Sequence, residues 1–152
     1  MEIKIRKAEE GDIDFLFLLR NQPSTYQYAK NAKPVELPEH LAWVKPVIEG
    51  ETEKNLFVLE VDGDKAGQVR IDVSEEQDQG EISISLMPAF QGKGIAKVAL
   101  DIAMDKMKKE RGIKLYTAQI HQDNIPSQKL FEKMGFEFKN QEDVWKTYVK
   151  RT

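Results

Sequence analysis

Two glycines flank a lysine in a segment whose residue types can bind an anion: Gln91, Gly92, Lys93, Gly94, Ile95 and Ala96. The segment lies between an alternating, strand-like pattern and a long amphipathic, helix-like one. Backbone N–H groups at a helix start point outward, and the helix dipole adds positive potential there. Glycines let a phosphate approach the backbone, and Lys93 adds a local positive charge. The segment therefore indicates a pyrophosphate site, although a tight turn that needs glycine only for its φ angles fits the spacing equally well.

Two common nucleotide-binding motifs do not fit this segment. A dinucleotide-binding loop has three glycines in the order G-x-G-x-x-G, and a Walker loop ends in Gly-Lys-Ser or Gly-Lys-Thr. Neither pattern occurs in the sequence. A nicotinamide cofactor and a nucleoside triphosphate are therefore not indicated.

The composition limits the class of protein. The 152 residues are 40% hydrophobic, which suits a single folded domain over 1–152. With 23 Lys plus Arg against 26 Asp plus Glu, we expect no nucleic-acid partner. The chain has no cysteine and only two histidines, so we expect no metal site. It shows no targeting segment or membrane-length apolar run, so we expect a cytoplasmic protein with no membrane partner.

Hydrophobic periodicity predicts an α/β domain. The pattern strand, helix, strand over 81–120 implies a parallel pair, whereas Asp62 and Gly63 form a hairpin signal between antiparallel strands. We expect a mixed, mostly antiparallel sheet of about seven strands with helices on both faces. The expected strands are 1–6, 56–61, 66–73, 81–86, 115–120, 136–138 and 144–149. The expected helices are 12–19, 38–48, 95–111 and 126–134, and residues 21–34 and 74–79 are expected to be loops.

A second motif follows the strand expected at 115–120. It contains Asn124, Ser127 and Phe131, and it predicts a helix that Pro126 begins and Gly135 ends. This motif and the segment over 81–96 together resemble the C-terminal motif and the acetyl-coenzyme A signature of the GNAT N-acetyltransferases. The expected element order is also similar to that family over nearly the whole chain.

The resemblance implies an enzyme that takes acetyl-coenzyme A (acetyl-CoA) as co-substrate and uses no metal. The strand Ser83–Met87 would splay from its neighbour and pair with the pantetheine arm like an added strand, and backbone N–H groups of 91–96 would bind the pyrophosphate. Asn124 fits a helix cap equally well, and Ser83 and Ser85 also fit simple strand alternation. The implied cofactor-binding residues are Ser85, Leu86, Met87, Gln91, Gly92, Lys93, Gly94, Ile95, Ala96, Asn124, Ser127 and Phe131.

Acetyl transfer to an amine needs a base for the acceptor ammonium and a hydrogen-bond donor for the tetrahedral oxyanion. Glu81 is the first candidate for the base, and a surface carboxylate is the alternative interpretation. His121 is the second candidate, and an exposed loop histidine is its alternative. We expect the oxyanion donor to be a backbone N–H near Leu86 or Met87.

The departing thiolate also benefits from a proton donor. The family often supplies a Tyr seven residues after the Asn, where this chain has Phe131. Tyr116, Tyr148 or a water molecule would have to replace that donor. Because a thiol is a tolerable leaving group, loss of the Tyr need not abolish activity.

In the family, the first helices and their loop line the acceptor site. Aromatic rings there can stack on a sugar or a base, and guanidinium groups can bind phosphate, although each residue also fits a packing or ion-pair role. These segments are similar to those of amino-sugar N-acetyltransferases of the pseudaminic-acid pathway type. The candidate acceptor-binding residues are Arg20, Tyr26, His40, Trp43 and Arg70.

Three functions fit these observations. The first is acetylation of a primary amine on a small molecule, such as a nucleotide-linked amino sugar, by direct attack in a ternary complex. The second is acetylation of a protein N-terminus or lysine, and the third is a non-catalytic module that binds acyl-coenzyme A. In each case we expect a monomer or a homodimer.

Overall fold

The chain forms one seven-stranded sheet with the order β1-β2-β3-β4-β5-β7-β6. The computed structural model describes residues 1–76 and 78–152. The strands are β1 (Ile3–Lys7), β2 (Lys54–Val61), β3 (Asp64–Val73), β4 (Gln79–Leu86), β5 (Leu115–His121), β6 (Glu137–Glu142) and β7 (Trp145–Arg151). The helices are α1 (Ile13–Arg20), α2 (Pro23–Tyr26), α3 (Leu37–Ile48), α4 (Ile95–Arg111) and α5 (Ile125–Lys133), with short 3-10 helices η1 (Glu10–Asp12) and η2 (Pro88–Phe90).

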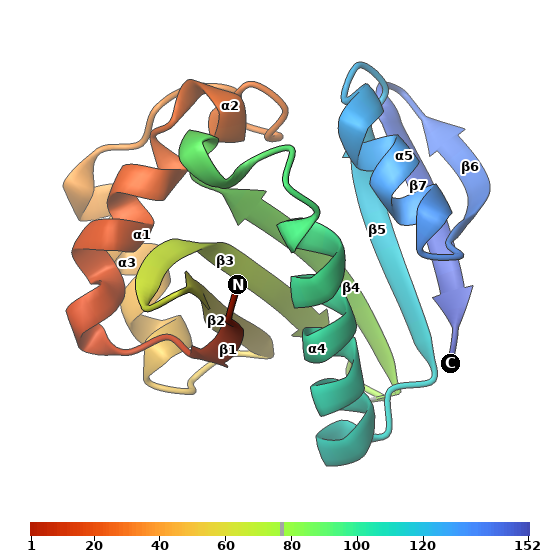
Figure 1. Ribbon diagram of the computed structural model, residues 1–152, viewed down its shortest axis with the longest axis horizontal. Helices are drawn as coiled ribbons and strands as arrows, with labels where there is room; N and C mark the ends of the chain where they lie inside the picture. The colour runs from red at the N-terminus through yellow and green to blue at the C-terminus, as the bar shows by residue number, and fades with distance from the viewer. Residues whose placement is uncertain (77) are drawn as a thin grey trace.

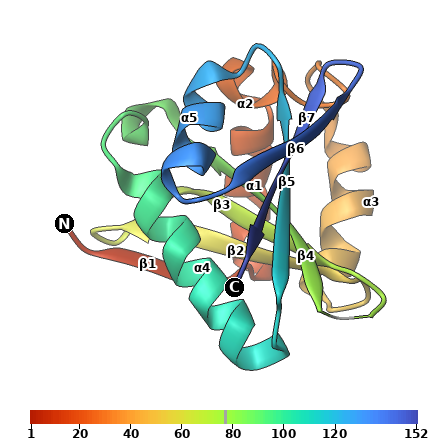
Figure 2. The same ribbon diagram turned by 90° about the vertical axis from the view of Figure 1, so that its right-hand side faces the viewer.

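Every pair of neighbouring strands is antiparallel except β4 and β5, which are parallel. Helices α4 and α5 lie on one face of the sheet, and α1 and α3 lie on the other (Figures 1 and 2). The expected mixed α/β architecture is therefore confirmed. Over the residues that the structure describes, no helix is both long and apolar enough to span a bilayer.

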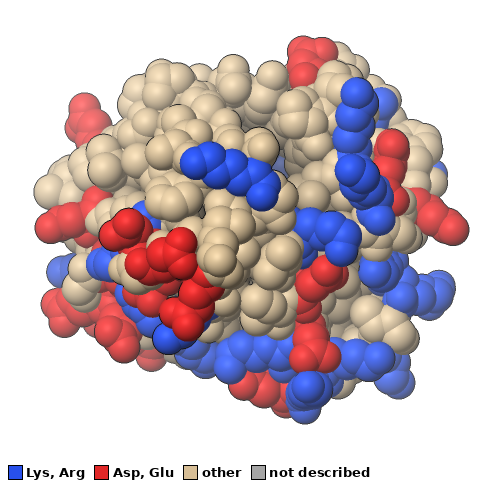
Figure 3. All heavy atoms as spheres, in the orientation of Figure 1, with Lys and Arg blue, Asp and Glu red and all other residues tan. Residues whose placement is uncertain are grey.

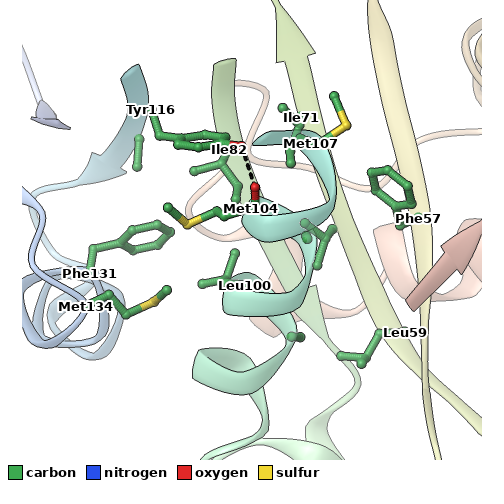
Figure 4. Packing of buried hydrophobic residues seen from close by; sticks show 14 of the residues in the cluster. Phe57, Leu59, Ile71, Ile82, Leu100, Met104, Met107, Tyr116, Phe131 and Met134 are labelled. Carbon is green, nitrogen blue, oxygen red and sulfur yellow. Dashed lines mark hydrogen bonds between the residues drawn. The ribbon is translucent and has the colours of Figure 1, made fainter. Parts of the chain in front are cut away.

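Strand alternation divides the core between the two faces of the sheet. Phe57, Leu59 and Ile71 point toward α4, where they pack with Leu100 and Met104 (Figure 4). On the opposite face a smaller cluster joins α1, α3 and β2, and its buried members include Leu16, Val44 and Val58. Strand β2 is thus covered on both sides.

One expected loop contains a helix. Residues 21–34 include α2, in which Pro23 occupies the first turn, where its missing N–H is tolerated, and the Tyr26 N–H donates to the Gln22 carbonyl oxygen at 3.0 Å. The single turn is too short to produce a clear hydrophobic period. The loop expected over 74–79 includes Gln77, which lies outside the described residues, and its last residue, Gln79, begins β4.

A buried carboxylate joins the N-terminal strand to the first helix. Asp12 is 2% exposed, and its two oxygens accept from the Arg6 guanidinium at 2.7 and 2.8 Å. The Lys65 ammonium lies 2.7 Å from the same carboxylate, and the Glu9 backbone N–H donates to it at 2.8 Å. Hydrogen bonds from Arg6 hold the pKa of Asp12 well below its ordinary value.

We predict that Asp12→Asn destabilises the fold by about 2 kcal/mol, because two partly buried cations lose their counter-charge. The wild-type advantage should be present above the ordinary Asp pKa of about 3.9 and lost as the pH falls toward the lower folded value. Denaturant unfolding from pH 2 to 7 measures this difference. The control, Asp101→Asn, removes an exposed pair with Lys97 and should change stability by less than about 0.5 kcal/mol. Equal effects of the two substitutions would contradict the assignment.

Candidate active site

The sheet opens between its two parallel strands. β4 and β5 pair only at Gln79 with Leu115, Gly80 with Tyr116, and Glu81 with Thr117. Beyond Glu81 the two strands diverge toward the end of the sheet where α2 lies (Figure 1). This opening forms a cleft of about 550 Å³. Its walls come from β4, β5, α5, the α2 region and the loop before α4.

The β4 edge that faces the cleft has backbone groups free of the sheet. The Met87 N–H donates to the carbonyl oxygen of Ala66 on the neighbouring strand β3 at 2.8 Å. Since backbone groups alternate in direction along a strand, the N–H groups of Ile84 and Leu86 point the other way, into the opening. The expectation of an oxyanion donor near Leu86 or Met87 therefore narrows to Leu86, because the Met87 N–H is engaged with β3.

The loop before α4 presents a run of backbone amides. Gly92 and Gly94 have φ angles of +72° and +76°, which favour glycine, and Gly94 is the N-cap of α4. Within the described part of the chain, the N–H groups of Gly92, Lys93 and Gly94 make no backbone hydrogen bond. The first N–H groups of α4 follow directly and are also free, as at every helix start. A Cβ on either glycine would meet open space, so an anion can approach this stretch of backbone.

The Gln91 side chain fixes the loop against its surroundings. Its Nε2 donates to the Leu86 carbonyl oxygen at 3.1 Å and lies 3.3 Å from the Ser24 Oγ of α2. The Gln91 N–H donates to the Pro88 carbonyl oxygen at 3.2 Å, which closes η2. One residue thus links the loop, the open end of β4 and the α2 region.

A close approach between strands shapes β4 at the cleft. Gly67 of β3 lies opposite Leu86 in the antiparallel register. A Cβ on Gly67 would collide with the Ser85 carbonyl oxygen and lie 2.9 Å from Leu86 Cδ2. Only glycine therefore lets β4 take this path at the two residues that line the opening.

The far wall of the cleft comes from the start of α5. The Asn124 side chain accepts from the Ser127 backbone N–H at 3.3 Å and so caps the helix, and both residues line the cleft. Phe131 also lines it, is 2% exposed, and meets Phe136 edge-to-face with ring centroids 5.0 Å apart. Asn124 therefore both caps α5 and lines the cleft.

Two aromatic side chains that are distant from His121 in the sequence flank its ring. The ring centroids of Tyr28 and Trp145 lie 5.5 and 5.4 Å from the His121 ring, and all three residues line the cleft. Lys30 lies 5.7 Å from the Trp145 ring centroid. His121 Nδ1 accepts from the Asp123 backbone N–H at 3.0 Å, so in the neutral imidazole the proton is assigned to Nε2.

The expected proton donors on β5 and β7 lie away from the cleft. Tyr116 is 0% exposed and donates its hydroxyl proton to the Met104 carbonyl oxygen at 3.0 Å (Figure 4), and burial raises the pKa of Tyr116 to about 12. Tyr148 is also buried, and its hydroxyl donates to Glu132 at 3.3 Å. Both hydroxyls have a structural partner in the fold, which corrects the expectation that Tyr116 or Tyr148 replaces the missing Tyr donor.

The remaining candidates separate into two places. Glu81 lies at the closed end of the opening, where β4 still pairs with β5, and it is not among the residues that line the cleft. A second cavity of about 270 Å³ lies between α1, α3 and β3, and we call it the arginine cavity; its walls include Arg20, Glu39, His40, Trp43, Gln68 and Arg70. Tyr26 lines neither hollow. Within 1–76 and 78–152, no three His, Asp or Glu side chains gather closely enough to hold a metal ion.

Comparisons with known proteins agree with this fold and opening. The family model described as the acetyltransferase (GNAT) domain matches residues 2–137. The spermidine N(1)-acetyltransferase of Escherichia coli strain K12 is 29% identical over 136 residues, which cover 88% of this chain and 72% of that protein. The crystal structure of a domain from Methanocaldococcus jannaschii has a TM-score of 0.86 at 24% identity and covers 99% of both chains. That of spermidine N-acetyltransferase from Vibrio cholerae, in complex with CoA and spermine, has a TM-score of 0.83 at 20% identity, over 97% of this chain and 92% of that one.

The chain belongs to the GNAT acetyltransferase family, since the family model covers most of its length. It is an acetyl-CoA-dependent N-acetyltransferase. The family resemblance read from the two sequence motifs is thereby confirmed, and acetyl-CoA is its co-substrate.

We predict that Gly67→Ala weakens the binding of coenzyme A at least about tenfold, because the added methyl displaces β4 at Ser85 and Leu86 and overpacking of this kind costs about 1–3 kcal/mol. Isothermal titration calorimetry measures the affinity. Gly11→Ala is the matched control, since a Cβ at Gly11 meets nothing within 4 Å. An unchanged affinity in a folded Gly67→Ala protein would show that the path of β4 does not shape the cleft.

Proposed function

We propose that this enzyme transfers the acetyl group of acetyl-CoA to a primary amine on a small hydroxylated molecule of the amino-sugar class, by direct attack in a ternary complex. The observation that supports this choice is the chemistry of the cleft wall. Among the described residues that line it, none is Asp, Glu, Lys or Arg. The lining instead combines hydroxyl and amide side chains with aromatic rings.

The polar and aromatic groups of the cleft suit a sugar. Ser83, Ser85 and Gln119 can exchange hydrogen bonds with hydroxyl groups, and Tyr28 and Trp145 can stack on a sugar face. The surface over α2 and the loop before α4 is also mostly uncharged (Figure 3). A polyamine such as spermidine, which the Escherichia coli relative is named for, carries several positive charges, and carboxylates would be needed to hold them. The described residues of the cleft wall include none.

The free amides over 92–96 fit a diphosphate, and the open β4 edge fits an extended amide chain. In this proposal residues 92–96 bind the diphosphate, Ile84 and Leu86 pair with the pantetheine arm, and Asn124 and Ser127 complete the wall. Bound acetyl-CoA supplies the thioester carbon that the amine attacks. The Leu86 N–H then donates to the oxygen on which negative charge develops.

Two residues are proposed to assist deprotonation of the amine and departure of the thiolate. The acceptor nitrogen must lose a proton before or as its bond to the acetyl carbon forms, and Glu81 receives that proton through water at the closed end of the opening. The carbon–sulfur bond breaks, and the departing thiolate takes a proton from water. The Nε2–H of His121 can donate a hydrogen bond that stabilises this thiolate, because Nδ1 already accepts a backbone hydrogen bond and cannot act as the base.

We predict that thiol release from acetyl-CoA will be fastest with amino sugars in a panel that also contains spermidine and a peptide with a free N-terminus. The reason is the uncharged, hydroxyl-rich wall of the cleft. A kcat/KM for spermidine or the peptide above that of every amino sugar would overturn the proposed acceptor and leave the acetyltransferase activity in place.

We predict that Glu81→Gln lowers kcat at pH 7 at least about a hundredfold, the usual scale for loss of a general base, and leaves the affinity for coenzyme A unchanged. Activity should partly recover at high pH, where the amine is already neutral. Steady-state rates from pH 6 to 10 measure both effects. Glu137→Gln, on the exposed strand β6, is the control. Wild-type turnover in Glu81→Gln at pH 7 would remove Glu81 as the base.

A further inference from the structure

The arginine cavity lies next to the cleft between β4 and β5, which we call the main cleft. Paired residues of β3 and β4 connect the two spaces. Its residues Gln68 and Arg70 on β3 lie directly opposite Ser85 and Ser83 on β4. Side chains of such cross-strand pairs share one face of the sheet, with their Cβ atoms about 5 Å apart. Ser83 and Ser85 line the main cleft. A molecule held among the serines can therefore extend its far end into the arginine cavity.

The cavity is lined by two guanidinium groups and one carboxylate, that of Glu39. Arg20 donates to the Asn31 and Lys33 carbonyl oxygens at 3.1 and 3.2 Å, which orients it and leaves other N–H groups free. The Arg70 guanidinium lies 5.5 Å from the Trp43 ring centroid, and its Nε lies 3.2 Å from Oδ1 of Asp72 on the same strand, so this carboxylate orients Arg70 and offsets part of its charge. Two arginines held on separate elements suit an anionic oxygen group such as phosphate or carboxylate.

A buried histidine lies in the same wall. His40 is 5% exposed, its Nε2 is buried, and no described residue forms a hydrogen bond with that nitrogen. Burial lowers the pKa of His40, so the ring is neutral at physiological pH. His40 therefore adds no charge of its own to this wall, and the positive charge of the cavity comes from Arg20 and Arg70.

We propose that the arginine cavity binds a phosphate or carboxylate group of the acceptor, so that the preferred substrates are anionic amino sugars. This inference rests on the proposed function, because it assumes that the reacting amine belongs to a sugar in the main cleft. It adds a binding site on α1, α3 and β3 that selects among amino sugars by charge.

Three acceptors test the proposal: glucosamine, glucosamine 6-phosphate and muramic acid, which carry no added anion, a phosphate and a carboxylate. We expect kcat/KM at saturating acetyl-CoA to be at least about tenfold higher for one or both anionic sugars than for glucosamine. Whichever anionic sugar is preferred identifies the group. In Arg70→Gln, and separately in Arg20→Lys, the ratio of anionic to neutral kcat/KM should fall toward one, mainly through KM of the anionic sugar.

Two controls separate binding from folding. Arg111→Gln changes a cation at the exposed end of α4 and should keep the wild-type ratio. Inorganic phosphate should inhibit glucosamine acetylation by the wild type more strongly than by Arg70→Gln, and thermal unfolding confirms that the variants fold. Equal kcat/KM for the three sugars, unchanged in Arg70→Gln, overturns this inference and leaves the proposed function standing. No acetylation of any of the three sugars overturns both.

Discussion

The short parallel pairing of β4 with β5 is the constraint on which the rest of the molecule depends. Three residue pairs join the strands, and beyond Glu81 they separate. Ile84 and Leu86 then have backbone groups directed away from β3 without a strand to receive them. Unpaired backbone groups on a buried edge are unfavourable unless water or a ligand satisfies them. The opening therefore supplies both the space and the hydrogen-bonding groups for an extended co-substrate.

Packing on the helical face of the sheet supports the two sides of this opening. Leu100 and Met104 of α4 face Phe131 and Met134 at α5 across the core (Figure 4). These contacts place α4 beside β4 and α5 beside β5, so the loop amides and the Asn124 cap lie on opposite walls. On the other face, Gln68 and Arg70 of β3 line the arginine cavity beside Ser83 and Ser85 of β4. The face with α4 and α5 thus holds the two walls of the opening in place, and the other face carries polar side chains.

Local patterns in the sequence predicted much of this architecture. Alternation, the Asp62 and Gly63 turn and the loop over 91–96 predicted the strands and the start of α4, because each is a property of neighbouring residues. Alternation places Tyr116 on the same face as Ala118 and Ile120, which line the cleft, so its burial at the closed end, where it pairs with Gly80, could not be predicted from the pattern. The group of Tyr28, His121 and Trp145 could not be predicted, since register and loop path bring these distant residues together.

The most direct test of the account follows individual backbone amides while coenzyme A is added. In ¹⁵N-resolved NMR spectra, the amides of Gly92, Lys93 and Gly94 should shift with coenzyme A but not with pantetheine, which lacks the diphosphate. Those of Ile84 and Leu86 should shift with both compounds. Loop amides that stay unchanged at saturating coenzyme A, or that respond equally to pantetheine, would contradict the claim that this loop binds the diphosphate.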